Sequence, residues 1–131
     1  MSMKKILVAA LVLTCTVLPI AATVLYERHH GTHFTAEILT RAPERGNYTP
    51  RKITVPVGEK VTLRVRNVDT VMHGFAIPAL GVDAGEINAG HQVIVEFTPE
   101  KVGVYDFYCT TWCSEFHLQM RGVLEVVGDE G

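Results

Sequence analysis

Short segments in which apolar and polar residues alternate recur along most of this chain. Residues 60–68 read KVTLRVRNV, so that Val61, Leu63 and Val65 fall on one face of a strand. No stretch after residue 30 has a convincing helical period, and Gly or Pro separates the strand-like segments. Comparable short segments are 33–39, 52–57, 72–77, 92–97, 103–108 and 122–127. A series of short strands joined by turns predicts an antiparallel β-sandwich or barrel.

Length and charge narrow the class of protein further. The 131 residues can form one domain with a hydrophobic core but are too few for two. The formal net charge is −2, and without a basic excess we expect no nucleic acid partner. Nothing in the sequence resembles a nucleophile with its base, a pair of catalytic acids or a phosphate-binding loop.

An apolar segment without charges, residues 6–25, follows two lysines at the N-terminus. Twenty helical residues extend about 30 Å, which is the thickness of the hydrocarbon core of a bilayer. The lysines predict a cytoplasmic N-terminus and an exported remainder, on the periplasmic or extracellular side of the cytoplasmic membrane. A cleaved signal peptide has a shorter apolar stretch, and here Val24 and Leu25 continue the run past small residues. We therefore favour an uncleaved anchor over a signal peptide.

This segment defines three expected parts of the chain. Residues 1–25 are the membrane anchor or signal peptide, and residues 26–33 form a polar tether. Residues 34–131 form the exported domain, and if residues 6–25 are retained, that domain is anchored to the membrane by a single helix.

The sequence CTTWCSEFHLQM, residues 109–120, gathers two cysteines, a histidine and a methionine in twelve positions. Their spacing also matches one face of a helix, where they could be ordinary core residues. Two adjacent β-branched threonines and the lack of flanking apolar residues argue against that helix. The segment lies between two expected strands, so we predict a loop, in which the four side chains either converge on a small volume or scatter.

Three uses of Cys109 and Cys113 compete. A disulfide suits an exported protein, but it would close a very small ring and leave His117 and Met120 unexplained. Zinc accepts Cys and His, but thioether sulfur is not one of its usual ligands. Thiolate, imidazole and thioether together are typical of copper electron-transfer sites. The ligand set therefore favours copper.

A copper site of this kind needs a second imidazole from elsewhere in the chain. His29, His30 and His33 fall in the expected tether, and His91 follows a glycine in a turn. His73 lies in the apolar segment TVMHGFAIP, where a buried imidazole needs a partner. A hydrogen-bonded core histidine is the ordinary explanation of such a residue. The metal-binding side chains of residues 109–120 make a metal ligand the better explanation of His73.

These two segments together resemble subunit II of cytochrome c oxidase. CTTWCSEFHLQM is similar to that family's dinuclear copper loop, Cys-x3-Cys-x3-His-x2-Met, and VMHGFAIPALGVDAG resembles its upstream histidine segment. The likeness covers about residues 50–127. The same CuA centre also occurs in nitrous oxide reductase. The resemblance implies an all-β fold, a cupredoxin-like Greek-key β-sandwich, with the N-terminal hydrophobic helix added to it.

The resemblance also implies a set of copper ligands. Cys109 and Cys113 would bridge two copper ions, and His73 and His117 would each bind one. Met120 and the backbone carbonyl of Thr111 would be weak axial ligands. The family often has Asp three residues before the upstream histidine, whereas this chain has Thr70 there and Asp69 one residue earlier.

The implied function is one-electron transfer by an exported protein that is not catalytic by itself, either free-standing or as a subunit of a terminal oxidase. The expected partners are a redox donor, such as a c-type cytochrome or another copper protein, and the remaining oxidase subunits. Two alternatives stay open: a copper-delivery protein for oxidase assembly, and a mononuclear blue or red copper carrier. The mononuclear site would use His73, Cys113, His117 and Met120.

Overall fold

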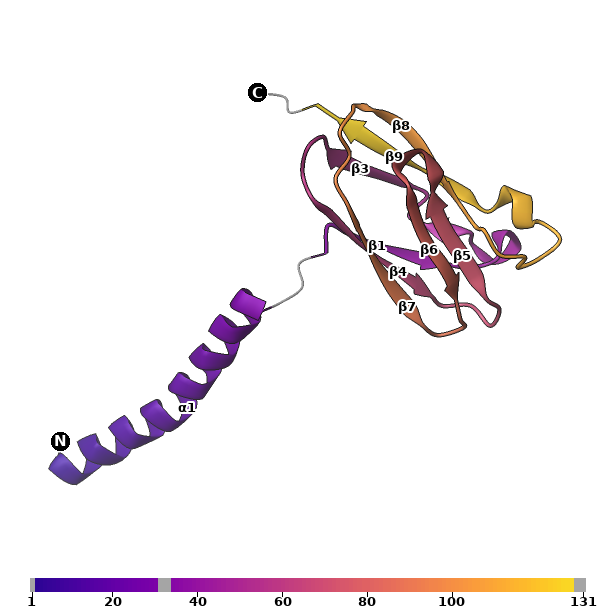
Figure 1. The fold of residues 1–131 in the computed structure, drawn as a ribbon. Coiled ribbons are helices and arrows are strands. Elements are labelled where there is room, and N and C mark those ends of the chain that lie inside the picture. Colours follow the sequence, from indigo (N-terminus) through magenta and orange to yellow (C-terminus); the bar gives the residue numbers. More distant parts are fainter. Residues whose placement is uncertain (1, 31–33, 129–131) are drawn as a thin grey trace. The chain divides into compact units, whose positions relative to one another are not determined.

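The computed structural model describes residues 2–30 and 34–128 (Figure 1). The chain divides into two units, Met1–His33 and Phe34–Gly131. Within the described residues, the first unit contains one helix and the second contains the strands.

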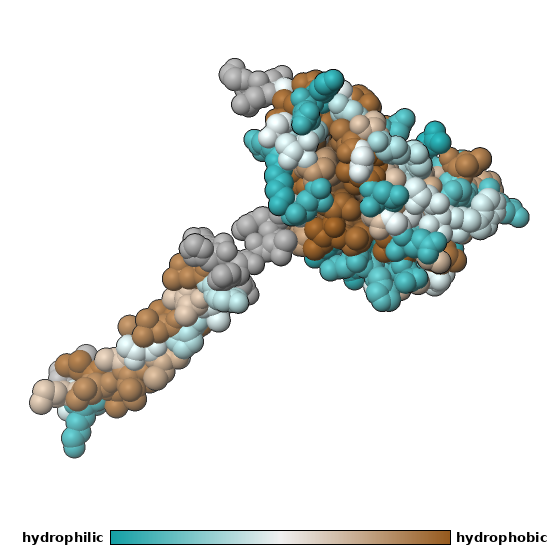
Figure 2. Space-filling model, in the orientation of Figure 1, coloured by the Kyte–Doolittle hydropathy of each residue, from teal (hydrophilic) through white to brown (hydrophobic). Residues whose placement is uncertain are grey.

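Helix α1, Met3–His30, is the only regular element of the first unit within the described residues. It carries no charged residue between Ile6 and Leu25, and Figure 2 shows its deepest hydrophilic colour at its start and hydrophobic colour along much of its length. The hydroxyl groups of Thr14, Thr16 and Thr23 donate to backbone carbonyls one turn earlier, so they do not require water. Residues Met3–Tyr26 are long and apolar enough to cross a membrane, a property that N-terminal signal sequences share.

The second unit is a sandwich of two β-sheets (Figure 1). One sheet has the order β2-β1-β4-β7 and the other the order β3-β9-β8-β5-β6. The strands are β1 (Ala36–Thr40), β2 (Tyr48–Thr49), β3 (Lys52–Pro56), β4 (Val61–Asn67), β5 (His73–Ile77), β6 (Val82–Ile87), β7 (Gln92–Phe97), β8 (Gly103–Tyr108) and β9 (Arg121–Val127). Three short 3₁₀ helices connect them: η1 (Pro43–Arg45), η2 (Pro78–Leu80) and η3 (His117–Gln119).

The predicted β-sandwich is confirmed, but the expectation that it is antiparallel throughout was wrong for two strand pairs. β1 pairs with β4 in parallel, and β3 pairs with β9 in parallel. Between β1 and β4 the chain crosses to the other sheet to form β3, and this excursion lets it return in the same direction without a helix. Alternation of residues indicates which face is buried but not the direction of the neighbouring strand.

The core lies between the sheets and contains a cluster of three aromatic rings. Tyr48, Phe75 and Phe107 are buried, and their ring centroids lie 5.2–5.9 Å apart in tilted or edge-on contacts. The Tyr48 hydroxyl donates to the carbonyl of Gly74 at 2.7 Å. Gly74 follows the first residue of β5, so this bond ties the core to the place where β5 begins.

Phe107→Ala should lower the free energy of unfolding by about 3–5 kcal/mol, because it empties a fully buried position between two aromatic rings. Val104→Ala is the matched control on the same strand, since Val104 is 66% exposed. Its effect should stay within about 0.5 kcal/mol. Chemical denaturation of both variants measures the difference, and equal losses would show that the aromatic cluster is not the centre of the core.

Candidate metal centre

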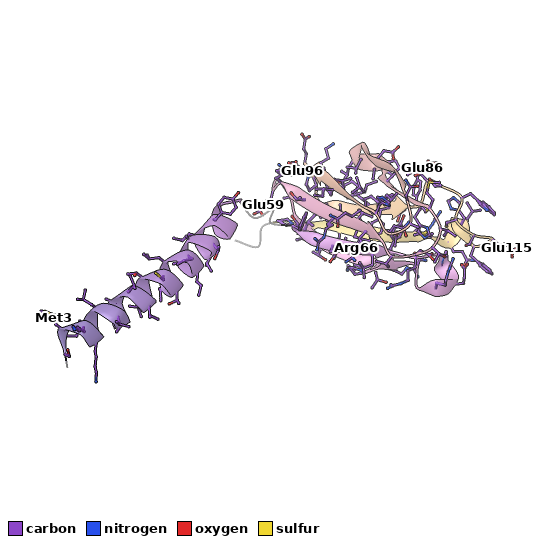
Figure 3. The ribbon with its side chains drawn as sticks, turned by 90° about the horizontal axis from the view of Figure 1, so that it is seen from below. Met3, Glu59, Arg66, Glu86, Glu96 and Glu115 are labelled. Atoms are coloured by element: carbon purple, nitrogen blue, oxygen red, sulfur yellow. The ribbon has the colours of Figure 1, made fainter. Side chains whose placement is uncertain are left out.

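The candidate site lies at one end of the sandwich, where the β8–β9 loop approaches the start of β5 (Figure 1). The loop projects beyond the sheets, and Glu115, labelled in Figure 3, marks its outer part. β5 and β8 are neighbours in the same sheet, paired at Ala76 and Tyr108. This pairing brings His73, the first residue of β5, next to a loop that follows it by some forty residues of sequence.

The segment 109–120 is a loop, as predicted, and not a helix. The backbone N–H of Cys109 donates to the carbonyl of Met120 at 3.1 Å, which closes the loop at its base. A single 3₁₀ turn precedes the closure, with the Met120 N–H bonded to the carbonyl of His117. These bonds place the first and last of the four soft side chains side by side.

The sulfur atoms of the loop gather around Cys113. Its Sγ lies 4.0 Å from the Sγ of Cys109, 3.7 Å from the Sδ of Met120 and 3.6 Å from the Nδ1 of His117. The carbonyl oxygen of Thr111 lies 3.1 Å from the Cys109 sulfur. Both cysteines are free thiols, and their separation is about twice the length of a disulfide bond.

His73 completes the cluster from β5. Its side chain is fully buried, and its Nε2 lies 3.0 Å from a carboxylate oxygen of Asp69. Its other nitrogen, Nδ1, has no hydrogen-bond partner although it is buried. Ligand atoms of His73, Cys109 and Cys113 lie within 4.8 Å of one another. A metal ligand explains the unpartnered nitrogen, because a carboxylate at the opposite nitrogen is the usual support of a ligating histidine.

Asp69 is a functional residue that the sequence comparison did not assign. The position expected to hold the carboxylate is Thr70, but the side chain of Asp69 reaches His73 instead. Burial would raise the pKa of Asp69. Hydrogen bonds from the Ala42 and Thr70 N–H groups, together with His73 and Arg45, outweigh burial and hold the pKa below its usual value. Asp69 is therefore a carboxylate that fixes the orientation of the His73 ring.

The two thiols of the site differ in acidity. Burial opposes ionisation of Cys109, but its interaction with His73 and a 3.2 Å hydrogen bond from the Gly74 N–H lower the pKa below the ordinary value. Burial and the neighbouring Cys109 charge raise the pKa of Cys113 to about 12. Cys109 is therefore the first thiolate of the pair, and metal binding at Cys113 would displace a proton.

The remaining histidines do not join the cluster in the described part of the chain. His91 is exposed in a turn, with its Nδ1 3.1 Å from the carbonyl of Ala89. The side chains of His29 and His30, and all of His33, lie outside the described residues. Of the two competing imidazoles that the structure describes, His73 and His91, His73 is thus the one that the fold brings to the loop.

The donor set fits copper. One buried imidazole, two thiols and a thioether converge, and a second imidazole and a carbonyl oxygen border them. Soft sulfur donors with imidazole select copper, whereas zinc sites rarely use thioether sulfur. The class of site that this geometry defines is a cupredoxin copper centre on a β-sandwich.

Comparison with known proteins agrees with this class. The model of the cupredoxin-like domain family matches residues 9–126. Nitrous-oxide reductase of Ralstonia nicotianae is 35% identical over 95 residues, which are 70% of this chain and 14% of that protein. A purple cupredoxin from Nitrosopumilus maritimus has 26% identity and a TM-score of 0.51 over 70% of this chain and 99% of that one.

A further solved structure, the periplasmic domain of subunit II of cytochrome oxidase from Bradyrhizobium japonicum, is similar in fold. Its identity is 22% and its TM-score 0.57, over 76% of this chain and 88% of that chain. The chain therefore belongs to the cupredoxin-like domain family. Its copper site contains His73, Cys109, Cys113 and Met120.

Gly74→Ala should weaken copper binding by roughly 10–100-fold, the usual cost of disturbing a group that supports a metal ligand. A Cβ at position 74 would lie 2.8 Å from the Thr110 backbone nitrogen and collide with the Thr110 hydroxyl. The loop would have to move away from β5, and the Cys109 sulfur would move with it. Copper titration followed by thiolate-to-copper absorption measures the loss.

Thr110→Ala is the control, because it removes the exposed hydroxyl without adding an atom at position 74. Its titration should match that of the original chain. A Gly74→Ala protein that binds copper as tightly as this control would show that the close approach of β5 to the loop does not position Cys109.

Proposed function

We propose that this protein is a one-electron carrier whose copper site is a dinuclear, CuA-type centre. Cys109 and Cys113 supply the two shared thiolates, His73 and His117 supply one imidazole each, and Met120 and the Thr111 carbonyl are the weak ligands. The single observation that carries the proposal is the presence of two adjacent cysteine sulfurs with an imidazole bordering the pair from β5 and another from the loop.

The placement of the two imidazoles supports a pair of ions. The ligand atoms of His73, Cys109 and Cys113 lie within 4.8 Å of one another. From the loop, Nδ1 of His117 lies 3.6 Å from the Cys113 sulfur. Each cysteine sulfur therefore has an imidazole near it, which suits two ions that would share both thiolates.

The protein contributes rigidity and dryness to the site. Copper, when bound, supplies the one-electron couple. Cys109, Cys113 and Met120 are 4%, 8% and 1% exposed, so water has little access to the sulfur donors. The loop is closed at its base by the Cys109–Met120 backbone bond, and the His73 ring is held by Asp69. Ligands that cannot move far favour fast electron transfer, because little reorganisation accompanies the change of charge.

The named relatives support this assignment in part. A nitrous-oxide reductase and a subunit II of cytochrome oxidase are both redox proteins by name. The chain spans only 12–14% of the length of the nitrous-oxide reductases that it matches. We therefore propose for this chain only the electron-transfer role, and not the reduction of nitrous oxide or oxygen.

The redox partner would dock on the exposed apolar side chains of the loop. Trp112, Phe116 and Leu118 are 72%, 47% and 78% exposed. The Trp112 ring lies 5.8 Å from the His117 ring, which makes it a short route to the centre. We place the domain on the exported side of the cytoplasmic membrane, held or delivered there by helix α1.

A copper-delivery role is the second candidate, and one observation favours it. A surface pocket at the loop is lined by Cys109, His117 and Met120 as well as Tyr108 and Leu118, so a copper acceptor could approach the site at His117, the least buried of these donors. The rate of copper transfer to a chelator separates the two roles. An electron carrier should release copper to the chelator slowly. A copper-delivery protein should release it rapidly.

The purified chain should bind two copper ions, with one unpaired electron shared between them. Metal analysis gives the stoichiometry, and electron paramagnetic resonance gives the number of copper nuclei that split the signal. One copper per chain with splitting from one nucleus would contradict the proposal and favour the mononuclear carrier.

Variants of the proposed copper ligands can be compared by the same electron paramagnetic resonance measurement. Cys109→Ser and Cys113→Ser should each abolish the shared signal, because each removes a bridging thiolate. Met120→Leu should keep it with a shifted potential, since axial ligands tune such sites.

A further inference from the structure

Residues 42–47 form a short segment between β1 and β2 that contains no copper ligand. The segment includes η1 (Pro43–Arg45) and precedes Tyr48. It is nevertheless in contact with both separated parts of the metal centre, the β8–β9 loop and the His73 side. These contacts are hydrogen bonds and one ion pair.

The first set of contacts holds the metal-binding loop. The Asn47 side-chain nitrogen, Nδ2, donates to the carbonyl of Gln119 at 2.8 Å, one residue before Met120. Asn47 is 6% exposed and has a φ of 61°, a conformation that Asn adopts more readily than most residues. At the surface, the hydroxyl of Ser114, the residue after Cys113, donates to the Glu44 carboxylate at 3.1 Å.

The second set holds the histidine from β5. The Ala42 N–H donates to Oδ2 of Asp69 at 2.8 Å, and the same oxygen lies 3.0 Å from Nε2 of His73. The Arg45 guanidinium pairs with the other oxygen of Asp69 at 3.0 Å and also reaches Thr70. The carboxylate that orients His73 is thus itself oriented by residues of this segment.

Backbone bonds make the segment one stiff unit. The N–H groups of Arg45 and Asn47 both donate to the carbonyl of Ala42, at 2.8 and 3.2 Å. The Arg41 N–H donates to the carbonyl of Asn47 at 3.1 Å. Ala42, which holds Asp69, and Asn47, which holds the loop, are therefore bonded to each other. We expect a displacement of Ala42 to move Asn47 as well, and a displacement of Asn47 to move Ala42.

We propose that residues 42–47 act as a clamp that fixes the separation between the His73 side and the loop side of the copper centre. Asn47 and Arg45 are positioning residues in this clamp, acting through Gln119 and Asp69. The meaning of the clamp for electron transfer rests on the proposed function. The clamp itself consists of protein contacts alone, so it can be tested without copper.

Asn47→Asp is the sharpest variant. Asp accepts the same left-handed backbone conformation and keeps the oxygen that receives the Tyr48 N–H. It cannot donate to the Gln119 carbonyl. Asn88→Asp makes the same chemical change on an exposed side chain and is the control. Arg45→Gln tests the other end of the clamp, with Arg66→Gln, exposed on β4, as its control.

The first measurement is amide hydrogen exchange of the full chain without added copper. Asn47→Asp should speed exchange of the Cys109 and Met120 amides, whose bonds close the loop, by roughly tenfold. The second is copper release to a chelator, which should accelerate about 10–100-fold in Asn47→Asp and in Arg45→Gln. The copper spectrum should change in both variants, and neither control should differ from the original chain.

The double variant, Asn47→Asp with Arg45→Gln, tests whether the loop side and the His73 side of the clamp act as one unit. If they do, its copper-release rate should rise by less than the product of the two single effects, because either change already loosens the clamp. A full product would mean two independent supports and would overturn the clamp. Equal exchange rates of the Cys109 and Met120 amides in Asn47→Asp and in Asn88→Asp would also overturn the clamp.

Two further outcomes are also decisive. If Asn47→Asp does not fold, Asn47→Gly replaces it, since glycine accepts the same φ and removes the side chain. If the original chain binds no copper, the proposed function fails, while the amide exchange result still accepts or rejects the clamp.

Discussion

A buried imidazole with one nitrogen bonded and the other without a protein partner is the constraint on which this structure depends. Nε2 of His73 contacts Asp69, and Nδ1 is buried without a hydrogen-bond partner. Leaving a buried polar atom unpaired costs free energy, and a bound metal would account for such an atom here. The two cysteine sulfurs of the β8–β9 loop lie near the His73 ring, and the Met120 sulfur lies 3.7 Å from that of Cys113, so that together they define a copper site.

The rest of the domain serves to hold that imidazole and that loop together. β5 starts at His73 and is tied to the aromatic core by the Tyr48–Gly74 hydrogen bond. Asp69 carries its charge in a nearly buried position because two backbone N–H groups and Arg45 surround it. The segment 42–47 supplies part of this support and also contacts the loop. Core, turn and metal site are thus parts of one hydrogen-bonded structure.

The sequence predicted the elements better than their arrangement. Strands such as 92–97 and 103–108 have the predicted bounds because a short apolar segment and its flanking turn residues are local signals. β6 was missed, since Gly85 and a register shift opposite β5 hide its pattern. The parallel pairs β1–β4 and β3–β9 depend on how the chain crosses between sheets, which no local pattern records. The four soft side chains were found because metal ligation requires particular residue types at a recognisable spacing.

The supporting residues could not be found in that way. Asp69 is one residue away from the position where resemblance placed a carboxylate, and its reach to His73 depends on the turn after β4. Asn47 and Gln119 are 72 residues apart, and an asparagine in a connecting segment carries no signal of its role. The residue types in a sequence indicate which side chains can bind a metal. Which residues hold those ligands in place depends on distances that only the folded chain defines.

X-ray absorption at the copper edge of the copper-loaded chain distinguishes a pair of ions from a single ion. If the two thiolates are shared by a pair of ions, the spectrum should show sulfur and nitrogen neighbours together with a short copper–copper contribution. Sulfur and nitrogen neighbours without a copper neighbour, at full loading, would exclude the shared pair.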